Sequence, residues 1–198
     1  MNPNICHKRK LIFVHNPKAA GMSFRKWLGF NGLVNHGFPS YNTPHQLWDL
    51  YTVVVCVRDP IDRAVSLYRF LTHESYNGGL LSVYPDLHSW DPPKFYQNII
   101  HEQLIFLAWQ YKYTQHFHTN KPADFILKVE NLDVGRLARK MGIQTPFPRE
   151  NFGKNKNTID LGQKLYDELV EHFKADFFFF DYSPKSYFQY MDMQSQAA

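Results

Sequence analysis

Three short, unbroken apolar runs along the chain predict buried β-strands. They span residues 11–14 (LIFV), 51–57 (YTVVVCV) and 124–129 (DFILKV), and polar or charged residues follow each of them. The run at 51–57 is β-branched and apolar on both faces, which is typical of a central strand in a parallel sheet. A fourth, shorter strand is expected at 33–35.

Between and after these runs, apolar residues recur every three or four positions, as on one face of an amphipathic helix. Five helices are expected on this ground, beginning near Gly21, Pro60, Phe95, Glu130 and Leu161. The third is expected to run to Phe117, the fourth to Met141–Gly142 and the last to Phe173. The alternation of strands and helices predicts an α/β fold in which helices flank a central parallel sheet and ligands bind at the carboxyl ends of its strands.

The composition indicates one domain over residues 1–198, with flexible ends at 1–9 and 194–198. Of the 198 residues 44% are hydrophobic and 17% aromatic, which is enough for a sizeable core, and the four phenylalanines at 177–180 are expected to pack against it. Cys6 and Cys56 are the only cysteines, so we expect a reducing compartment and no disulfide framework. The run at 11–14 is too short for a signal peptide or a transmembrane segment, and a cytoplasmic location is therefore expected.

The charge of the chain favours anionic ligands. Its formal net charge is +4 and its pI about 8.9. The lysines and arginines are not clustered densely enough for a nucleic-acid binder, so a small-molecule partner is expected. The cysteines, histidines and carboxylates form no cluster with the spacing of metal ligands, and we expect no metal. The oligomeric state stays open.

The stretch from 11 to 28 (LIFVHNPKAAGMSFRKWL) reads as strand, loop and helix. Such a junction points free backbone N–H groups of the first helical turn toward the carboxyl end of the strand, where an anion can bind. Ala19, Ala20 and Gly21 allow a close approach of the backbone, Ser23 offers a hydroxyl and Lys18 offers an ammonium group. The stretch therefore predicts a phosphate-binding loop.

A second anion site is expected where the strand at 51–57 ends. Arg58 and Asp59 follow this strand, and Pro60 begins the next helix with Asp59 as its expected N-cap. Ser66 lies in the second turn of that helix. An arginine and a hydroxyl that converge near a helix start suit a phosphate group.

The two stretches together resemble the nucleotide-binding motifs of a known enzyme family. The loop PKAAGMS is not a Walker A loop, because its lysine precedes its glycine, but it resembles the 5′-phosphosulfate loop of sulfotransferases. VRDPIDRAVSLYRF resembles their 3′-phosphate motif, VR(D/N)PxxRxxSxY. The similarity extends to VENL at 129–132 and to the DFFFFDY ending at 176–182, and so covers nearly the whole chain. The chain thus resembles PAPS-dependent sulfotransferases, in particular the carbohydrate-type branch with heparan and uronosyl 2-O-sulfotransferases.

This resemblance implies a single P-loop-like domain that transfers a sulfuryl group from 3′-phosphoadenosine 5′-phosphosulfate (PAPS) to an acceptor hydroxyl, in line and without a metal. The expected acceptor is a carbohydrate or glycolipid, and the nucleotide product is adenosine 3′,5′-bisphosphate (PAP). Lys18 is expected to stabilise charge on the leaving oxygen. The residues expected to bind the nucleotide are Lys18, Ala19, Ala20, Gly21, Met22, Ser23, Phe24, Arg58 and Ser66, with Asn155 and Lys156 from the basic loop at 147–158.

A general base must take the proton of the acceptor, and histidine suits this task near neutral pH. His36 follows the expected strand at 33–35, on the loop that carries a catalytic histidine in the 2-O-sulfotransferase-like branch. In that branch the context is Gly-His-x-x-(Tyr/Phe), whereas here it is NHGFPSY, with the tyrosine displaced. His36 is therefore the expected base, and His45 is the alternative.

Two other functions remain open from the sequence. A P-loop kinase-like phosphotransferase would need a Walker A loop and an acidic magnesium ligand, and the sequence offers neither. A non-catalytic nucleotide- or anion-binding module would bind without turnover.

The glycine- and proline-rich segment at 78–93 is expected to select the acceptor.

Overall fold

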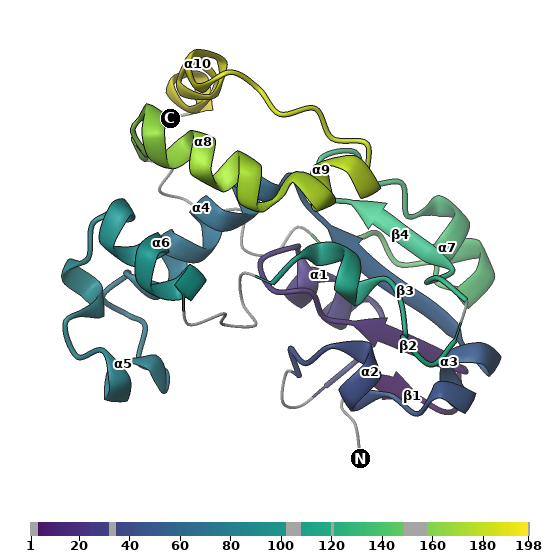
Figure 1. Ribbon diagram of the computed structural model, residues 1–198. Helices are drawn as coiled ribbons and strands as arrows, with labels where there is room; N and C mark the ends of the chain where they lie inside the picture. Colours follow the sequence, from purple (N-terminus) through teal and green to yellow (C-terminus); the bar gives the residue numbers. More distant parts are fainter. Residues whose placement is uncertain (1–3, 32–34, 102–107, 120, 149–157, 198) are drawn as a thin grey trace. The chain divides into compact units, whose positions relative to one another are not determined.

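A computed structural model describes residues 4–31, 35–101, 108–119, 121–148 and 158–197 (Figure 1). The chain divides into two compact units. The first, here the sheet unit, comprises residues 1–59 and 109–152, and the second, the helical unit, comprises 60–108 and 153–198. The grouping of 1–198 into one domain stays a prediction.

The described residues of the sheet unit form four strands, in the order β1 (Ile5–Cys6), β2 (Leu11–Val14), β3 (Thr52–Val57) and β4 (Phe125–Lys128). β1 pairs antiparallel with β2, and the other pairs are parallel. The three main predicted strands and the α/β class are thereby confirmed, with a mostly parallel sheet. Residues 32–34 lie outside the described residues, so the strand expected at 33–35 lies largely there too.

Aromatic residues join the sheet to the helix that follows β2. This helix, α1 (Gly21–Trp27), begins at the predicted residue and buries Phe24 and Trp27. The rings of Phe24 and Phe13 stack with centroids 5.8 Å apart, and Trp27 Nε1 donates a hydrogen bond to the carbonyl of Thr145. The core of the sheet unit thus fixes the start of α1 against the end of β2.

The other helices of the sheet unit are α2 (Pro39–Asn42), α3 (His45–Leu50), the 3₁₀ helix η3 (Gln110–Tyr113) and α7 (Gly135–Met141). The predicted end of α7 is confirmed, since Gly142 has φ +64° and closes the helix. Its start differs from the prediction: α7 begins at Gly135, five residues after Glu130, with Val134 as its N-cap. Just before the helix, the carboxylate of Asp133 accepts the N–H of Gly135 in a local turn.

The helical unit contains α4 (Pro60–Leu71), α5 (Leu80–Val83), the 3₁₀ helix η1 (Leu87–Ser89), α6 (Pro92–His101), α8 (Gln163–His172), α9 (Lys174–Phe179) and α10 (Tyr187–Ala197). The predicted start of α4 at Pro60 is confirmed. The core of the helical unit contains Leu67, Phe95, Leu169 and Phe173, each fully or almost fully buried. No helix among the described residues is long and apolar enough to cross a membrane.

The helix expected over 95–117 is wrong at its carboxyl end. α6 ends at His101, and residues 102–107 lie outside the described part. The backbone is extended at Trp109 (φ −55°, ψ 131°), and only the short 3₁₀ turn η3 follows. Tyr111, an apolar position of the pattern that predicted the helix, lies in this turn and is half-buried, whereas the neighbouring Tyr113 is fully buried.

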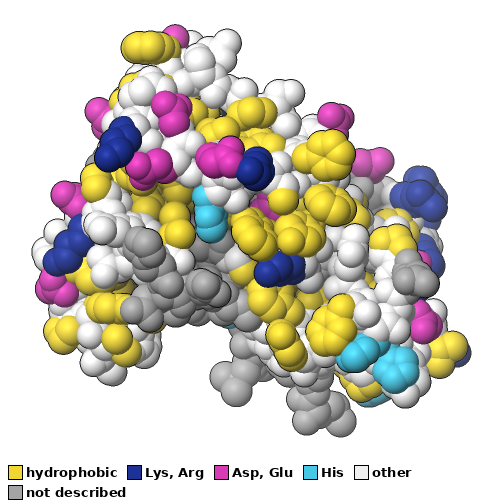
Figure 2. Space-filling model, viewed as in Figure 1, with side chains coloured by type: hydrophobic (Ala, Val, Ile, Leu, Met, Phe, Trp, Pro, Cys, Tyr) yellow, Lys and Arg dark blue, Asp and Glu magenta, His cyan; other side chains and the backbone are white. Residues whose placement is uncertain are grey.

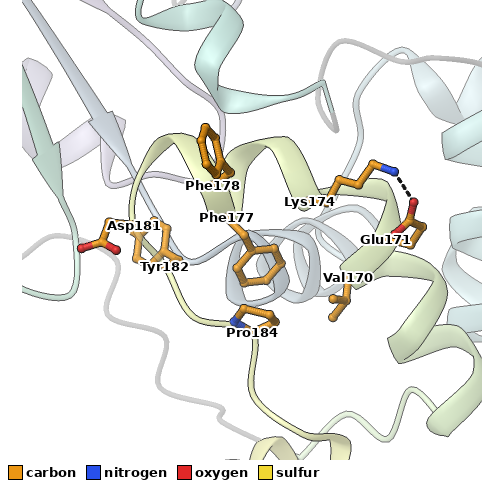
Figure 3. A pocket seen from close by; sticks show the side chains of 8 residues that line it. All are labelled: Val170, Glu171, Lys174, Phe177, Phe178, Asp181, Tyr182 and Pro184. Atoms are coloured by element: carbon orange, nitrogen blue, oxygen red, sulfur yellow. Dashed lines mark hydrogen bonds and ion pairs between the residues drawn. The ribbon is translucent and has the colours of Figure 1, made fainter.

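The four phenylalanines at 177–180 divide into two pairs, which corrects the expectation that all would pack against the core. Phe177 and Phe180 are buried, whereas Phe178 is 85% and Phe179 51% exposed. A helix turns successive residues to different sides, and Phe177 and Phe178 point to opposite sides of α9 (Figure 3). Hydrophobic side chains accordingly gather on the surface over α9 (Figure 2).

Both chain ends contain regular secondary structure, and their flexibility stays a prediction. Residues 5–6 form β1, whose register with β2 pairs Ile5 with Ile12. At the other end, α10 extends to Ala197.

Candidate anion-binding site

Two basic residues follow the carboxyl ends of adjacent strands. β2 and β3 are parallel, with Val14 opposite Val55, so their carboxyl ends lie at one edge of the sheet. Lys18 comes four residues after β2, and Arg58 comes directly after β3. Burial, and then the charge of Arg58, lower the pKa of Lys18 from 10.5 to about 8. The structure thus brings together two of the residues that the sequence predicted as phosphate ligands.

No described residue forms an ion pair or hydrogen bond with the guanidinium group of Arg58. A cation held next to another cation favours an anion between them, because the anion offsets both the repulsion and the loss of hydration. Arg58 therefore has donors available for a phosphate or sulfate group.

The loop between β2 and α1 has an unusual backbone. Lys18 (φ +64°) and Ala20 (φ +55°) both adopt the left-handed conformation, which costs about 1–3 kcal/mol for a residue other than glycine. Such conformations persist where the surrounding structure holds them, and they are concentrated at binding sites. The small residues predicted for close approach fit this loop, in which Ala19 is fully buried.

Gly21 is required here because of a close contact and not because of its φ angle. A Cβ atom at this position would lie 2.1 Å from Nε2 of His15. The imidazole of His15 therefore packs directly on the first residue of α1. This ring is buried, and burial, followed by the charges of His36, Arg25 and Lys18, lowers the pKa of His15 to about 3, so the ring is neutral at pH 7.

Two buried amide side chains connect the loop to the end of β3. Asn16 Nδ2 donates to the carbonyl oxygen of Cys56 at 2.9 Å and to Oε1 of Gln110 at 3.0 Å. Oε1 of Gln110 also accepts the backbone N–H of Arg58 at 2.9 Å, and its Nε2 donates to the carbonyl oxygen of Arg58 at 2.7 Å. The backbone of Arg58 is thereby held on both sides by one side chain.

The sequence interpretation missed both of these amides. Asn16 gives a weak signal, since it is a polar residue directly after a buried strand. Gln110 gives none, because it falls within the region that was expected to be an amphipathic helix. Nδ1 of His15 and Oδ1 of Asn16 are buried without a partner among the described residues, and unsatisfied atoms of this kind require an explanation such as a bound ligand or water.

The structure brings His36 to this site. Its ring centroid lies 4.5 Å from that of His15, at an interplanar angle of 77°. Burial lowers the pKa of His36, a hydrogen bond to the backbone of His15 opposes this effect, and the charges of Lys18 and Arg25 lower the pKa further. A neutral imidazole of this kind can accept a proton.

His45, the alternative base, has different neighbours. It is exposed at the start of α3, and its ring lies 6.4 Å from that of His116 and 6.1 Å from that of His118. Among the described residues, no group of three or more histidines, cysteines or carboxylates is arranged to hold a metal ion.

The remaining predicted ligands have mixed placements. Met22 is half exposed, Ser23 is 2% exposed, and Phe24 is fully buried in the core, so its side chain serves packing. Ser66 lies in α4, within the helical unit, and its convergence with Arg58 stays a prediction. Asn155 and Lys156 lie outside the described residues.

The helical unit carries a surface hollow of about 480 Å³ between α8, α9 and the segment that follows (Figure 3). Phe177, Phe178 and Pro184 line it, together with the ion pair of Lys174 and Glu171. None of the predicted site residues lines this hollow.

Comparisons with models of known families, with curated proteins and with solved structures give no match for this chain.

Proposed function

We propose that the protein is a PAPS-dependent sulfotransferase that transfers a sulfuryl group to an acceptor hydroxyl. The observation that carries this proposal is the meeting of Lys18 and Arg58 at the carboxyl ends of two adjacent parallel strands. Each residue belongs to a separate sequence motif that resembles a phosphate-binding motif of this family. Two anion-binding groups at one sheet edge suit a nucleotide with phosphate groups at both its 5′ and 3′ positions.

In this proposal Lys18 and the loop at 18–24 bind the 5′-phosphosulfate, while Arg58 binds the 3′-phosphate. The acceptor oxygen forms a bond to sulfur as the bond between sulfur and the bridging oxygen breaks, and PAP leaves with the bonding electron pair. Lys18 stabilises the negative charge that develops on the bridging oxygen, which is an effect specific to the transition state.

His36 takes the proton of the acceptor hydroxyl in the same proposal. Its lowered pKa keeps the imidazole neutral at pH 7 and therefore able to accept this proton. The edge-to-face contact with His15 orients the ring. A carbohydrate or glycolipid is the proposed acceptor class.

The test is transfer of labelled sulfate from PAPS to a panel of sugar, glycolipid, phenol and peptide acceptors. Lys18→Ala is expected to weaken PAPS binding and to lower turnover by a larger factor, because Lys18 acts most strongly in the transition state. Lys8→Ala is a matched control, since Lys8 is an exposed lysine in the turn before β2, at the other end of that strand. PAP binding without transfer to any acceptor would favour a non-catalytic nucleotide-binding module instead.

A further inference from the structure

We propose that Gln110 is a positioning residue that, together with Asn16, holds Arg58 in place for the 3′-phosphate of the nucleotide. This inference rests on the proposed function and extends it to a residue that no motif in the sequence indicates. The side chain of Gln110 is fully buried and that of Asn16 is 1% exposed, so neither amide serves as a surface group.

The side chain of Gln110 pairs with the backbone of Arg58. One amide group accepts the N–H of Arg58 and donates to the carbonyl oxygen of the same residue, at 2.9 and 2.7 Å. Both backbone polar groups of a residue just beyond the strand are thereby satisfied by a single side chain. This bidentate contact replaces the ladder pairing that ends with Val57 and fixes the backbone from which the guanidinium group extends.

The side chain of Arg58 is not held in the same way as its backbone. Its guanidinium group has no ion pair or hydrogen bond with any described residue, so the backbone determines where this cation lies. A long side chain with few constraints binds a phosphate more strongly when its base is held in advance, because less freedom is lost on binding.

The same two amide side chains connect the two predicted phosphate sites. Oε1 of Gln110 also accepts a hydrogen bond from Asn16, which lies two residues before Lys18. The Asn16 amide in turn binds the carbonyl oxygen of Cys56 within β3. Asn16 and Gln110 together therefore set the separation between the loop of Lys18 and the backbone of Arg58. This is the distance that a ligand with phosphates at both ends must match.

The experiment compares PAP with adenosine 5′-phosphate (AMP) on wild-type protein and on Gln110→Met, which keeps the side-chain length and removes the hydrogen bonds to Asn16 and to the backbone of Arg58. We expect the dissociation constant of PAP to rise about tenfold or more, and that of AMP to rise less than about threefold, because AMP lacks the 3′-phosphate. Gln46→Met, on the exposed face of α3 in the same unit, is the matched control and is expected to leave both constants unchanged.

A second variant keeps the test decisive if Gln110→Met does not fold. Gln110→Glu preserves the shape of the side chain, and its ionised carboxylate competes with the phosphate for Arg58. Once protonated, the carboxyl group can donate to the carbonyl oxygen of Arg58 as the amide does. Because this position is fully buried, the pKa of the carboxyl group is expected to lie above its ordinary value, and the affinity for PAP, relative to wild type at the same pH, is expected to recover as the pH is lowered from about 7 to about 5.

Equal loss of affinity for PAP and AMP in either variant would show a general structural role and overturn the positioning role of Gln110, as would unchanged PAP affinity in both variants. These results leave the proposed function standing. Failure of the wild-type protein to bind PAP would overturn the proposed function, and the inference with it.

Discussion

At the scale of single residues, Lys18 links the proposed site to pH. Its pKa of about 8 in the free protein reflects burial and the charge of Arg58. A bound phosphate favours the protonated amine, so the pKa is higher in the complex. PAP is therefore expected to bind most tightly below pH 8 and to lose affinity as the pH rises above 8, with a proton taken up on binding in that range.

This pH dependence can be measured by titration calorimetry in buffers of different ionisation enthalpy. The proton uptake between pH 8 and 9 is expected to disappear in Lys18→Met, which keeps the length of the side chain without its charge. Proton uptake that persists unchanged in Lys18→Met would assign the effect to another group.

The lowered pKa of Lys18 also affects the stability of the ligand-free protein. Between pH 8 and pH 10.5 the unfolded chain keeps a proton on Lys18 that the folded chain releases. The unfolded state therefore binds more protons, and the free energy of unfolding rises with pH across this window. Urea denaturation at several pH values should give a smaller rise for Lys18→Met than for wild type. An equal rise in both proteins would contradict the assignment.

Turnover of two alanine variants distinguishes His36 from His45 as the general base. His36→Ala is expected to lower turnover by roughly 10²–10⁴-fold while PAP affinity stays nearly constant, because the proposed role concerns only the acceptor proton. In wild type, kcat/KM is expected to rise with pH through a value below 6.5, since the pKa of His36 is lowered from 6.5 in the free protein. This limb is expected to be lost in His36→Ala. Normal turnover in that variant, with loss in His45→Ala, would assign the base to His45.

Gly21 provides a test of the loop packing. Gly21→Ala would place a methyl group against the imidazole of His15 and is expected to destabilise the fold by about 1–3 kcal/mol. The double variant with His15→Ala is expected to recover part of this loss, because the smaller side chain leaves room for the methyl group. Gly79→Ala is the control, since a Cβ atom there would meet no atom within 4 Å. Equal effects of the two glycine substitutions on urea denaturation would contradict the contact.

At the scale of elements, α9 shows how a helix divides a run of identical residues. Phe177→Ala removes a buried ring and is expected to cost about 3 kcal/mol of stability. Phe178→Ala removes a ring that is 85% exposed, and its effect is expected to stay within about 0.5 kcal/mol. Chemical denaturation of the two variants measures this difference, and similar losses would mean that Phe178 is also packed in solution.

The strands were predictable from sequence, and several helix ends were not. β-branched apolar runs such as the one in β3 have few alternatives to a buried strand, and Gly142 has a local reason to end a helix. The segment near Gln110 has no residue pattern of this kind that specifies its local structure. Its hydrogen bonds go to Asn16 and Arg58, which are distant in sequence, so the apolar pattern alone could not distinguish a 3₁₀ turn from a continued helix.

At the scale of the whole molecule, the sequence was sufficient for part of the candidate site. Lys18 and Arg58 could be expected at one edge because parallel strands align their carboxyl ends. Two other features could not be predicted: the hydrogen bond between Asn16 and Gln110, and the contact of His15 with Gly21. Both arise in the folded chain, and no local sequence pattern specifies them. The role of Ser66 as a partner of Arg58 stays a prediction.

In the proposed site, one nucleotide with phosphates at both ends binds at Lys18 and Arg58. The most direct measurement is the melting temperature of the protein with PAP, AMP or ATP at equal concentration, for wild type, Arg58→Ala and the control Lys8→Ala. A ligand at about 100 times its dissociation constant adds about 2.7 kcal/mol of stability, which shifts the melting temperature by several degrees.

The proposed site predicts a much larger shift with PAP than with AMP or ATP in wild type and in Lys8→Ala. It also predicts that Arg58→Ala weakens PAP by about 1.5–3 kcal/mol and leaves AMP nearly unchanged, because the lost contact is a charge-assisted hydrogen bond to the 3′-phosphate. Equal shifts with all three nucleotides, or a PAP shift that survives in Arg58→Ala, would contradict it.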